Sequence, residues 1–328
     1  MSGAAGLGQR LGRPDRPVLL FSITPPRAST SAADRQRVAD VTVQRLRPLD
    51  LDALILYDID DESDRNGAER PFPYLPTVDP GGFAAAHLQD WERPVVVYRC
   101  VGKYDQASLG RWLRAQHPDR VGTVLVGASS STKPVRTSLT QAHALWRATA
   151  PAVPLGGVAV PERHARRGDE HRRMLAKQAA GCSYFVSQIV YDTGAATELA
   201  ADYRQACSEA GVAPAPVVFT LSVCGSTRTL AFLNWLGVDL PGWMREELER
   251  AEDPVAVSAA QCLAVAHELA AACERLGLRY GFNVESVSIR RAEIDASVRL
   301  ARQLGERRAA LGQRRSAPVP TAGEVMAR

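Results

Sequence analysis

The chain has 328 residues, of which 45% are hydrophobic and 23% are charged, and its 40 basic and 36 acidic residues leave a net charge of +4 at pH 7. This length fits one large domain, and the hydrophobic fraction is ordinary for a globular core. The small net charge, without a basic stripe interleaved with aromatic residues, argues against nucleic-acid binding. No run approaches the roughly 20 apolar residues that a membrane span needs.

Residues 1–17 lack the apolar stretch of a secretory signal, and we expect mobile tails over residues 1–17 and 312–328. The six cysteines form no C-x-x-C pair and show no zinc-binding spacing. We therefore expect buried free thiols, no metal site and a reduced, cytoplasmic protein.

Apolar runs typical of strands alternate along the chain with segments of helical composition. The predicted strands are Val18–Ile23, Ala53–Ile59, Pro94–Cys100, Gly122–Val126, Leu155–Val160, Tyr184–Tyr191, Pro216–Ser222 and Arg279–Val287. The predicted helices are Asp34–Leu46, Phe83–Trp91, Ser108–Gln116, Leu139–Thr149, Glu170–Ala180, Ala195–Ala210, Ser226–Leu236, Val255–Leu276 and Glu293–Arg308.

Eight mostly apolar strands alternating with helices predict a parallel sheet covered by helices. Eight such units close most simply into a single-domain (β/α)8 barrel over residues 18–311, a TIM barrel. An open doubly wound sheet is the alternative, but no Gly-x-Gly-x-x-Gly opens a helix after the first strand. Pro241-Gly242-Trp243-Met244 predicts an extra helix after the seventh strand.

Polar residues cluster at the ends of two neighbouring predicted strands. Glu162 and His164 follow the run that stops at Pro161, and Gln188 and Asp192 lie at the end of the next run. In a β/α barrel the carboxyl ends of the strands converge on the active site, so we expect these side chains near one pocket.

This central stretch resembles the methylenetetrahydrofolate reductase family. The family's Pro-Glu-x-His, its Lys before Ala-Gly and its Thr-Gln-x-x-x-Asp correspond to Pro161-Glu162-Arg163-His164, Lys177 and Ser187-Gln188-x-x-x-Asp192. Weaker matches are Phe21-Ser22-Ile23-Thr24-Pro25-Pro26, Leu125-Val126-Gly127-Ala128 and Ile289-Arg290-Arg291-Ala292-Glu293.

The resemblance implies a flavin-dependent oxidoreductase of folate metabolism, in which hydride passes from NADH or NADPH to FAD and then to methylene-tetrahydrofolate. It implies flavin contacts from the residues Tyr57, Gly127, Glu162, His164 and Lys177. It also implies that Gln188 holds the pterin and acts in catalysis, and that Ser22 and Arg291 contact the substrate. A homo-oligomer is compatible with this assignment.

Two charged positions of the family are absent. Ser22 stands where the family has its acid/base Glu, and Ala128 stands where it has an Asp beside the flavin. A hydroxyl group cannot replace a carboxylic acid as a proton donor near neutral pH. Glu285 and Asp58, the latter in the acidic cluster 58–62, are therefore predicted as replacement acids; a salt-bridged residue and a solvated loop are the structural alternatives.

These departures leave other functions open. One is a barrel with a folate or flavin pocket that performs one-carbon transfer or lyase chemistry without hydride transfer. Another is a folate-binding homologue without catalytic activity.

Overall fold

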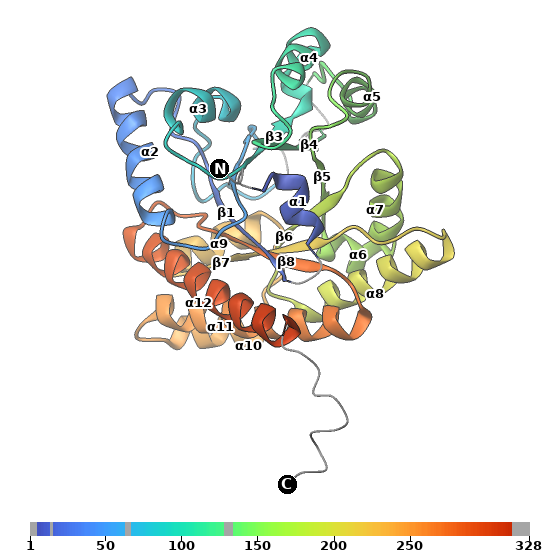
Figure 1. Ribbon diagram of the computed structural model, residues 1–328. Coiled ribbons are helices and arrows are strands. Elements are labelled where there is room, and N and C mark those ends of the chain that lie inside the picture. The colour runs from blue at the N-terminus through green and yellow to red at the C-terminus, as the bar shows by residue number, and fades with distance from the viewer. Residues whose placement is uncertain (1–4, 14–15, 63–66, 128–133, 317–328) are drawn as a thin grey trace.

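Eight parallel strands close into one barrel in the order β1 to β8, surrounded by helices (Figure 1). The computed structural model describes residues 5–13, 16–62, 67–127 and 134–316. The strands are β1 (Val18–Ile23), β2 (Ala53–Leu56), β3 (Val95–Cys100), β4 (Val121–Val126), β5 (Leu155–Ala159), β6 (Tyr184–Ile189), β7 (Val217–Ser222) and β8 (Tyr280–Glu285). The predicted single-domain (β/α)8 barrel is confirmed.

Helices follow the strands as predicted, with additions. They are α1 (Leu7–Gly12), α2 (Ala32–Leu46), α3 (Pro80–His87), α4 (Gln106–Arg114), α5 (Leu139–Thr149), α6 (Pro161–Arg167), α7 (Glu170–Ala179), α8 (Thr193–Glu209), α9 (Thr227–Trp235), α10 (Gly242–Arg250), α11 (Pro254–Leu276) and α12 (Arg291–Ser316), with a short 3-10 turn at Val101–Lys103. The extra helix predicted after the seventh strand is α10.

The segment directly after β5, which is not among the predicted helices, forms the short helix α6. Pro161 occupies its first turn, where the fixed φ of proline suits a helix and its missing N–H is not needed. Gly168 ends it with a φ of 66°, a left-handed conformation that favours glycine. The second helix of this connection, α7, begins two residues later.

Alternate residues of the strands fill the barrel interior. Its apolar layers include Leu20, Ile55, Val96, Val186 and Val218, all fully buried. This alternation follows from the two-residue repeat of a strand.

Helix α1 covers the amino-terminal end of the barrel (Figure 1). Its Leu7 and Leu11 are buried in the interior cluster. The prediction of a mobile tail over residues 1–17 is therefore wrong for α1, because Leu7 and Leu11, four residues apart, pack into the interior of the barrel. Near the carboxyl terminus of the chain, α12 continues to Ser316, past the predicted boundary at 311. Residues 317–328 lie outside the described residues.

A buried ion pair fastens α12 to the amino-terminal end of the barrel. Arg308 and Asp52, both at most 2% exposed, form an ion pair. Asp52 also accepts hydrogen bonds from the backbone N–H of Leu19 at 2.9 Å and from Arg16 at 3.1 Å. The pair thus joins the last helix to β1 and to the residue that precedes β2.

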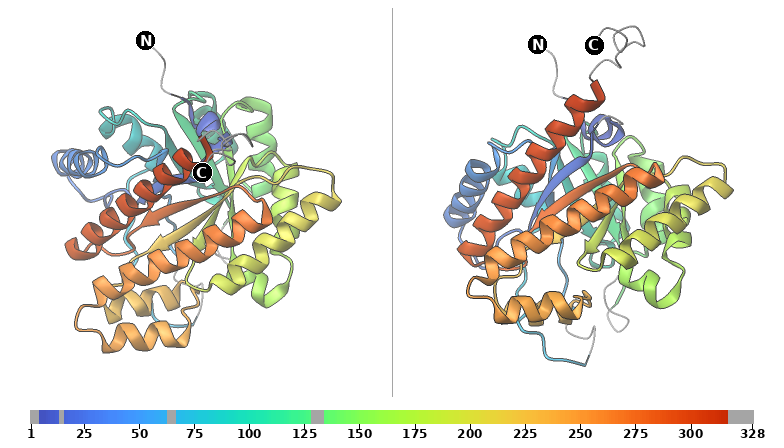
Figure 2. Two further views of the ribbon diagram at one scale, coloured as in Figure 1. Left: turned by 60° about the horizontal axis from the view of Figure 1, so that its bottom comes forward. Right: turned by 90° about the horizontal axis from the view of Figure 1, so that it is seen from below.

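Helix α11 is the one helix among the described residues that is long and apolar enough to cross a membrane by length and composition. It packs against β7, β8, α8, α10 and α12 on the outside of the barrel (Figure 2). This packing accounts for its apolar side chains. All six cysteines are buried free thiols, as expected.

We predict that Arg308→Ala lowers the free energy of unfolding by about 3 kcal/mol, because it leaves a buried carboxylate without its main partner. Arg302→Ala, an exposed change on the same helix, is the matched control and should cost less than about 0.5 kcal/mol. Urea unfolding of the two variants measures the difference. Equal loss in both would show that the buried pair does not stabilise the barrel.

Candidate functional site

Polar side chains from four strands meet inside the carboxyl-terminal end of the barrel. Ser22 is near the end of β1, Tyr57 follows β2, Thr220 lies on β7, and Asn283 and Glu285 lie on β8. They continue the inward-facing positions of the apolar layers below. Ser22, Tyr57 and Thr220 each lie two residues after an interior residue of the same strand, and Asn283 and Glu285 are two residues apart on β8. We call these five residues the mouth cluster.

The amide of Asn283 connects the cluster. Its Nδ2 donates to Ser22 Oγ at 3.1 Å, Tyr57 Oη at 3.1 Å and Thr220 Oγ1 at 3.3 Å. Thr220 is fixed in turn by Ser187, whose Oγ accepts from the Thr220 backbone N–H at 2.9 Å. A single buried side chain therefore orients donors from three other strands.

Glu285 is a buried carboxyl group, 8% exposed, that forms no ion pair with the described residues. Its Oε2 accepts hydrogen bonds from Tyr57 Oη at 2.5 Å and from Ser22 Oγ at 3.3 Å. Burial raises its pKa from 4.5 to about 7, and the bonds from Tyr57 and Ser22 offset only part of that rise. Glu285 can therefore exchange a proton near neutral pH.

The serine at the family's acid position thus contacts a carboxyl group from another strand. Leu20 pairs with Asn283 across β1 and β8, which brings Ser22 beside Glu285 two residues further along. The geometry agrees with the prediction that Glu285 supplies the missing acid, although its catalytic role stays a prediction.

Tyr57 remains a hydrogen-bond donor in this site. Burial and the neighbouring Glu285 raise the pKa of its hydroxyl group well above 10. Its ring packs edge-on against Tyr98, with ring centroids 4.9 Å apart. Tyr57 lies at the mouth of the barrel, and its predicted contact with a flavin stays a prediction.

Three polar atoms at this end of the barrel are left without hydrogen bonds from the described residues. They are Asn283 Oδ1 and Ser222 Oγ, both buried, and Glu285 Oε1. Ser222 pairs with Glu285 in the register of β7 and β8, so these atoms belong to adjacent strands. Buried polar atoms are nearly always paired, and a ligand is one explanation of the exception.

Gln188 lies in an irregular part of β6, where the register with β7 shifts between Val186 and Ile189. Its Nε2 donates to the carbonyl oxygen of Leu236 at the end of α9, at 2.9 Å. Such a bulge redirects side chains, and here it ties the amide to α9, so that no hydrogen bond joins Gln188 to the mouth cluster.

Residues 68–72 of the connection after β2 contact α9, the helix that follows β7. Trp235 Nε1 donates to the carbonyl oxygen of Ala68 at 3.0 Å, and Arg228 donates to that of Pro71 at 2.8 Å. The rings of Phe72 and Phe232 pack edge-on at 5.2 Å. These contacts hold residues 68–72 against α9.

Asp58 does not fit the predicted role of proton donor. Its carboxylate pairs with Lys103 Nζ at 2.5 Å and accepts from the backbone N–H of Cys100 at 2.9 Å and from Tyr104 Oη at 2.8 Å. Asp58 follows Tyr57, so the strand repeat turns it away from the barrel interior. Its contacts describe a structural ion pair that fixes the ends of β2 and β3.

Two of the predicted flavin contacts also lie elsewhere. The His164 ring is buried between α6 and α8, with Nε2 3.1 Å from Asp202 Oδ2. Lys177 lies behind β5, where its Nζ donates to the carbonyl oxygen of Val158 at 2.5 Å and faces Glu170 at 3.7 Å. The position of each residue around its helix directs its side chain to these contacts. Neither side chain therefore fits a flavin at the mouth.

The other predicted site residues are dispersed. Glu162 is buried in the first turn of α6, where burial raises its pKa to about 7 and its Oε2 has no hydrogen bond from the described residues. Gly127 directly follows β4, and a Cβ there would meet no atom of the described residues within 4 Å. Arg291 is exposed and pairs with Asp295 four residues on, so it does not reach the mouth cluster. Ala128 lies outside the described residues.

Comparison with known proteins places the chain in a family. An uncharacterized protein from Clostridium thermocellum, which binds two copies of 5-methyl-5,6,7,8-tetrahydrofolic acid, is 33% identical over 92% of this chain and 99% of its own, with a TM-score of 0.81. The chain belongs to the same family as that protein.

A more distant likeness shows the fold alone. The oxygenating constituent of 3,6-diketocamphane monooxygenase from Pseudomonas putida, in complex with FMN, is 12% identical over 92% of this chain and 98% of its own, with a TM-score of 0.55. No protein-family model and no curated protein matches the chain. Membership of the methylenetetrahydrofolate reductase family therefore stays a prediction.

The raised pKa of Glu285 predicts a specific pH dependence of stability. Between about pH 4.5 and 7 the unfolded chain releases this proton while the native protein keeps it, so the free energy of unfolding falls as pH rises. We predict that Glu285→Gln removes this fall, which amounts to up to about 3 kcal/mol. Urea unfolding of native protein and variant at pH 5 and pH 8 measures it.

Glu162 contributes a fall of the same sign to both proteins, so their difference isolates Glu285. Exposed Glu268→Gln on α11 is the control and should follow the native curve. If Glu285→Gln also runs parallel to native protein between pH 5 and 8, the carboxyl group is not held protonated by burial.

Proposed function

We propose that this protein binds a reduced folate, of the 5-methyltetrahydrofolate class, at the carboxyl-terminal mouth of its barrel. The observation that carries the proposal is the Glu285 carboxyl group, which is buried beside Ser22 and Tyr57 with one oxygen left for a ligand. The binding of 5-methyltetrahydrofolate by the relative from Clostridium thermocellum supports the same class of ligand.

The chemistry of the cluster matches a pterin ring. The amino-pyrimidinone edge of a reduced pterin presents adjacent N–H donors. An ionised carboxyl group with a free oxygen accepts such donors, and a pKa of about 7 lets Glu285 ionise at neutral pH. Asn283 Oδ1 is a second unpaired acceptor on the same strand, and Ser222 Oγ is a hydroxyl group that can donate or accept. A ligand seated here would pair groups whose burial is otherwise costly.

Tyr57 and Asn283 preorganise this site. Their hydrogen bonds fix Glu285 Oε2 and Ser22 Oγ before a ligand arrives, so that less conformational entropy is lost on binding. Tyr57 also presents an aromatic ring, held by Tyr98, beside the carboxyl group. The site therefore offers a flat heterocycle both a hydrogen-bond acceptor and an aromatic ring to pack against.

The proposal assigns no step to a flavin. The residues predicted to hold FAD include His164 and Lys177, and these pack between helices and behind β5. Catalysis of a folate reaction remains a hypothesis within the proposal. If one occurs, Glu285 is the proton donor that we expect, since a pKa of about 7 suits proton transfer at neutral pH.

We predict that calorimetry detects binding of 5-methyltetrahydrofolate to native protein and that Glu285→Gln weakens it about tenfold or more. The amide presents an N–H donor in place of an acceptor, which leaves a buried pair mismatched at about 1–3 kcal/mol. Glu268→Gln, on the exposed face of α11, is the control and should bind as the native protein does.

Gln188→Ala tests the second predicted folate contact in the same titration, with exposed Gln205→Ala on α8 as its control. Native protein without measurable affinity for any reduced folate would overturn the proposed function. Equal affinity of native protein and Glu285→Gln would move the ligand away from the mouth cluster.

A further inference from the structure

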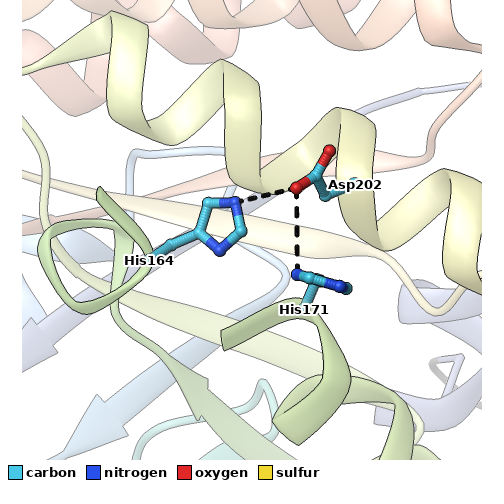
Figure 3. A group of neighbouring side chains, drawn as sticks. All are labelled: His164, His171 and Asp202. Carbon is cyan, nitrogen blue, oxygen red and sulfur yellow. Dashed lines mark ion pairs between the residues drawn. The ribbon is translucent and has the colours of Figure 1, made fainter. Parts of the chain in front are cut away.

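Outside the barrel, two histidines and an aspartate converge on one point. Figure 3 shows the imidazole rings of His164, from α6, and His171, from α7, directed at the carboxylate of Asp202 on α8. His164 Nε2 lies 3.1 Å and His171 Nδ1 lies 3.8 Å from the same oxygen, Asp202 Oδ2. One ligand atom from each of the three residues lies within 4.8 Å of the other two.

Only one edge of this triangle is short enough for a hydrogen bond. The contact of His164 with Asp202 has hydrogen-bond length, whereas 3.8 Å is too long for one. His171 Nδ1 is consequently a buried nitrogen without a hydrogen-bond partner among the described residues. This nitrogen is directed at the Asp202 carboxylate but lies 3.8 Å from its nearest oxygen.

Shared coordination of a metal ion accounts for both spacings. Zinc bonds of about 2.0–2.2 Å to nitrogen and oxygen place tetrahedral ligand atoms about 3.3 Å apart. The two distances to Asp202 lie on either side of that value. The rings stand edge-on, with centroids 5.2 Å apart and planes at 89°, so their nitrogens can approach one ion from different directions.

The charges around the cluster permit a cation there. Three arginines on α6 and α7 are paired with other acids: Arg163 with Glu170 at 2.8 Å, Arg166 with Asp239 at 3.4 Å and Arg173 with Asp169 at 3.2 Å. Among the described residues, the ion pairs of the Asp202 carboxylate are with the two histidines. Its side chain is 46% exposed, which allows a water molecule to complete the coordination.

We propose that His164, His171 and Asp202 form a binding site for a divalent transition-metal ion such as Zn²⁺, which fastens α6 and α7 to α8. Imidazole and carboxylate groups suit this class of ion. The ion would stabilise the folded protein, because the three ligands come together only when the three helices pack. The site lies on the outer helices, so it is separate from the proposed folate site.

The test is a titration of untagged, EDTA-dialysed protein with ZnCl2 by isothermal titration calorimetry. We expect one Zn²⁺ per chain and a rise in the thermal unfolding temperature on binding. His171→Ala and Asp202→Asn should each weaken binding at least about tenfold, because even changes to groups that only orient metal ligands cost that much. Both side chains are partly exposed, so the variants should fold, as circular dichroism will check.

His117→Ala is the matched control, since His117 also lies near an aspartate, Asp119 at 3.9 Å, but is exposed. It should bind Zn²⁺ as the native protein does. Native protein that takes up no Zn²⁺ would overturn the proposal. So would His171→Ala and Asp202→Asn that bind as tightly as native protein, since the cluster would then be only an ion pair between His164 and Asp202.

Discussion

Glu285 carries a buried carboxyl group that has no positively charged neighbour among the described residues, and the arrangement of the barrel mouth depends on it. Burying an unpaired charge is costly, so the group keeps its proton to higher pH and relies on hydrogen bonds from Tyr57 and Ser22. Those donors come from β2 and β1, on the far side of the closure between β1 and β8. The site therefore exists only when the barrel is closed.

Asp52 and Glu285, two buried acids at opposite ends of the barrel, are held in different ways. At the amino-terminal end Asp52 is paired with Arg308 and also bonded by Arg16, so its charge is neutralised within the fold. At the carboxyl-terminal end Glu285 meets only neutral donors. This contrast agrees with the general division of a TIM barrel into a stabilising face and a functional face.

Most of the fold could be predicted from the repeated alternation of strand and helix patterns in the sequence. Eight apolar runs separated by helical segments predicted every strand to within a few residues, and the two-residue alternation alone could have placed Tyr57 inside and Asp58 outside. The short helix α1 was not predicted, because Leu7 and Leu11 are its two apolar side chains in an otherwise polar, glycine-containing segment. Thr220 and Asn283 carried a weaker signal, as polar residues on otherwise apolar strands.

Side-chain direction after a strand was harder to predict. His164 and Lys177 lie on helices whose phase decides whether they face the mouth or the neighbouring helix. Pro161 was interpreted only as the end of the preceding strand, although it also begins α6. The grouping of His164, His171 and Asp202 had no sequence signature, because Asp202 comes from a helix beyond the next strand. Tertiary packing alone brings the three together.

The binding of a reduced folate beside Glu285 can be observed in a crystal structure of the native protein grown with 5-methyltetrahydrofolate. We expect pterin density at the carboxyl ends of β1, β7 and β8, with an N–H group of the ring within hydrogen-bond distance of Glu285 Oε1. Pterin density elsewhere on the protein, with the mouth cluster holding only water, would contradict it.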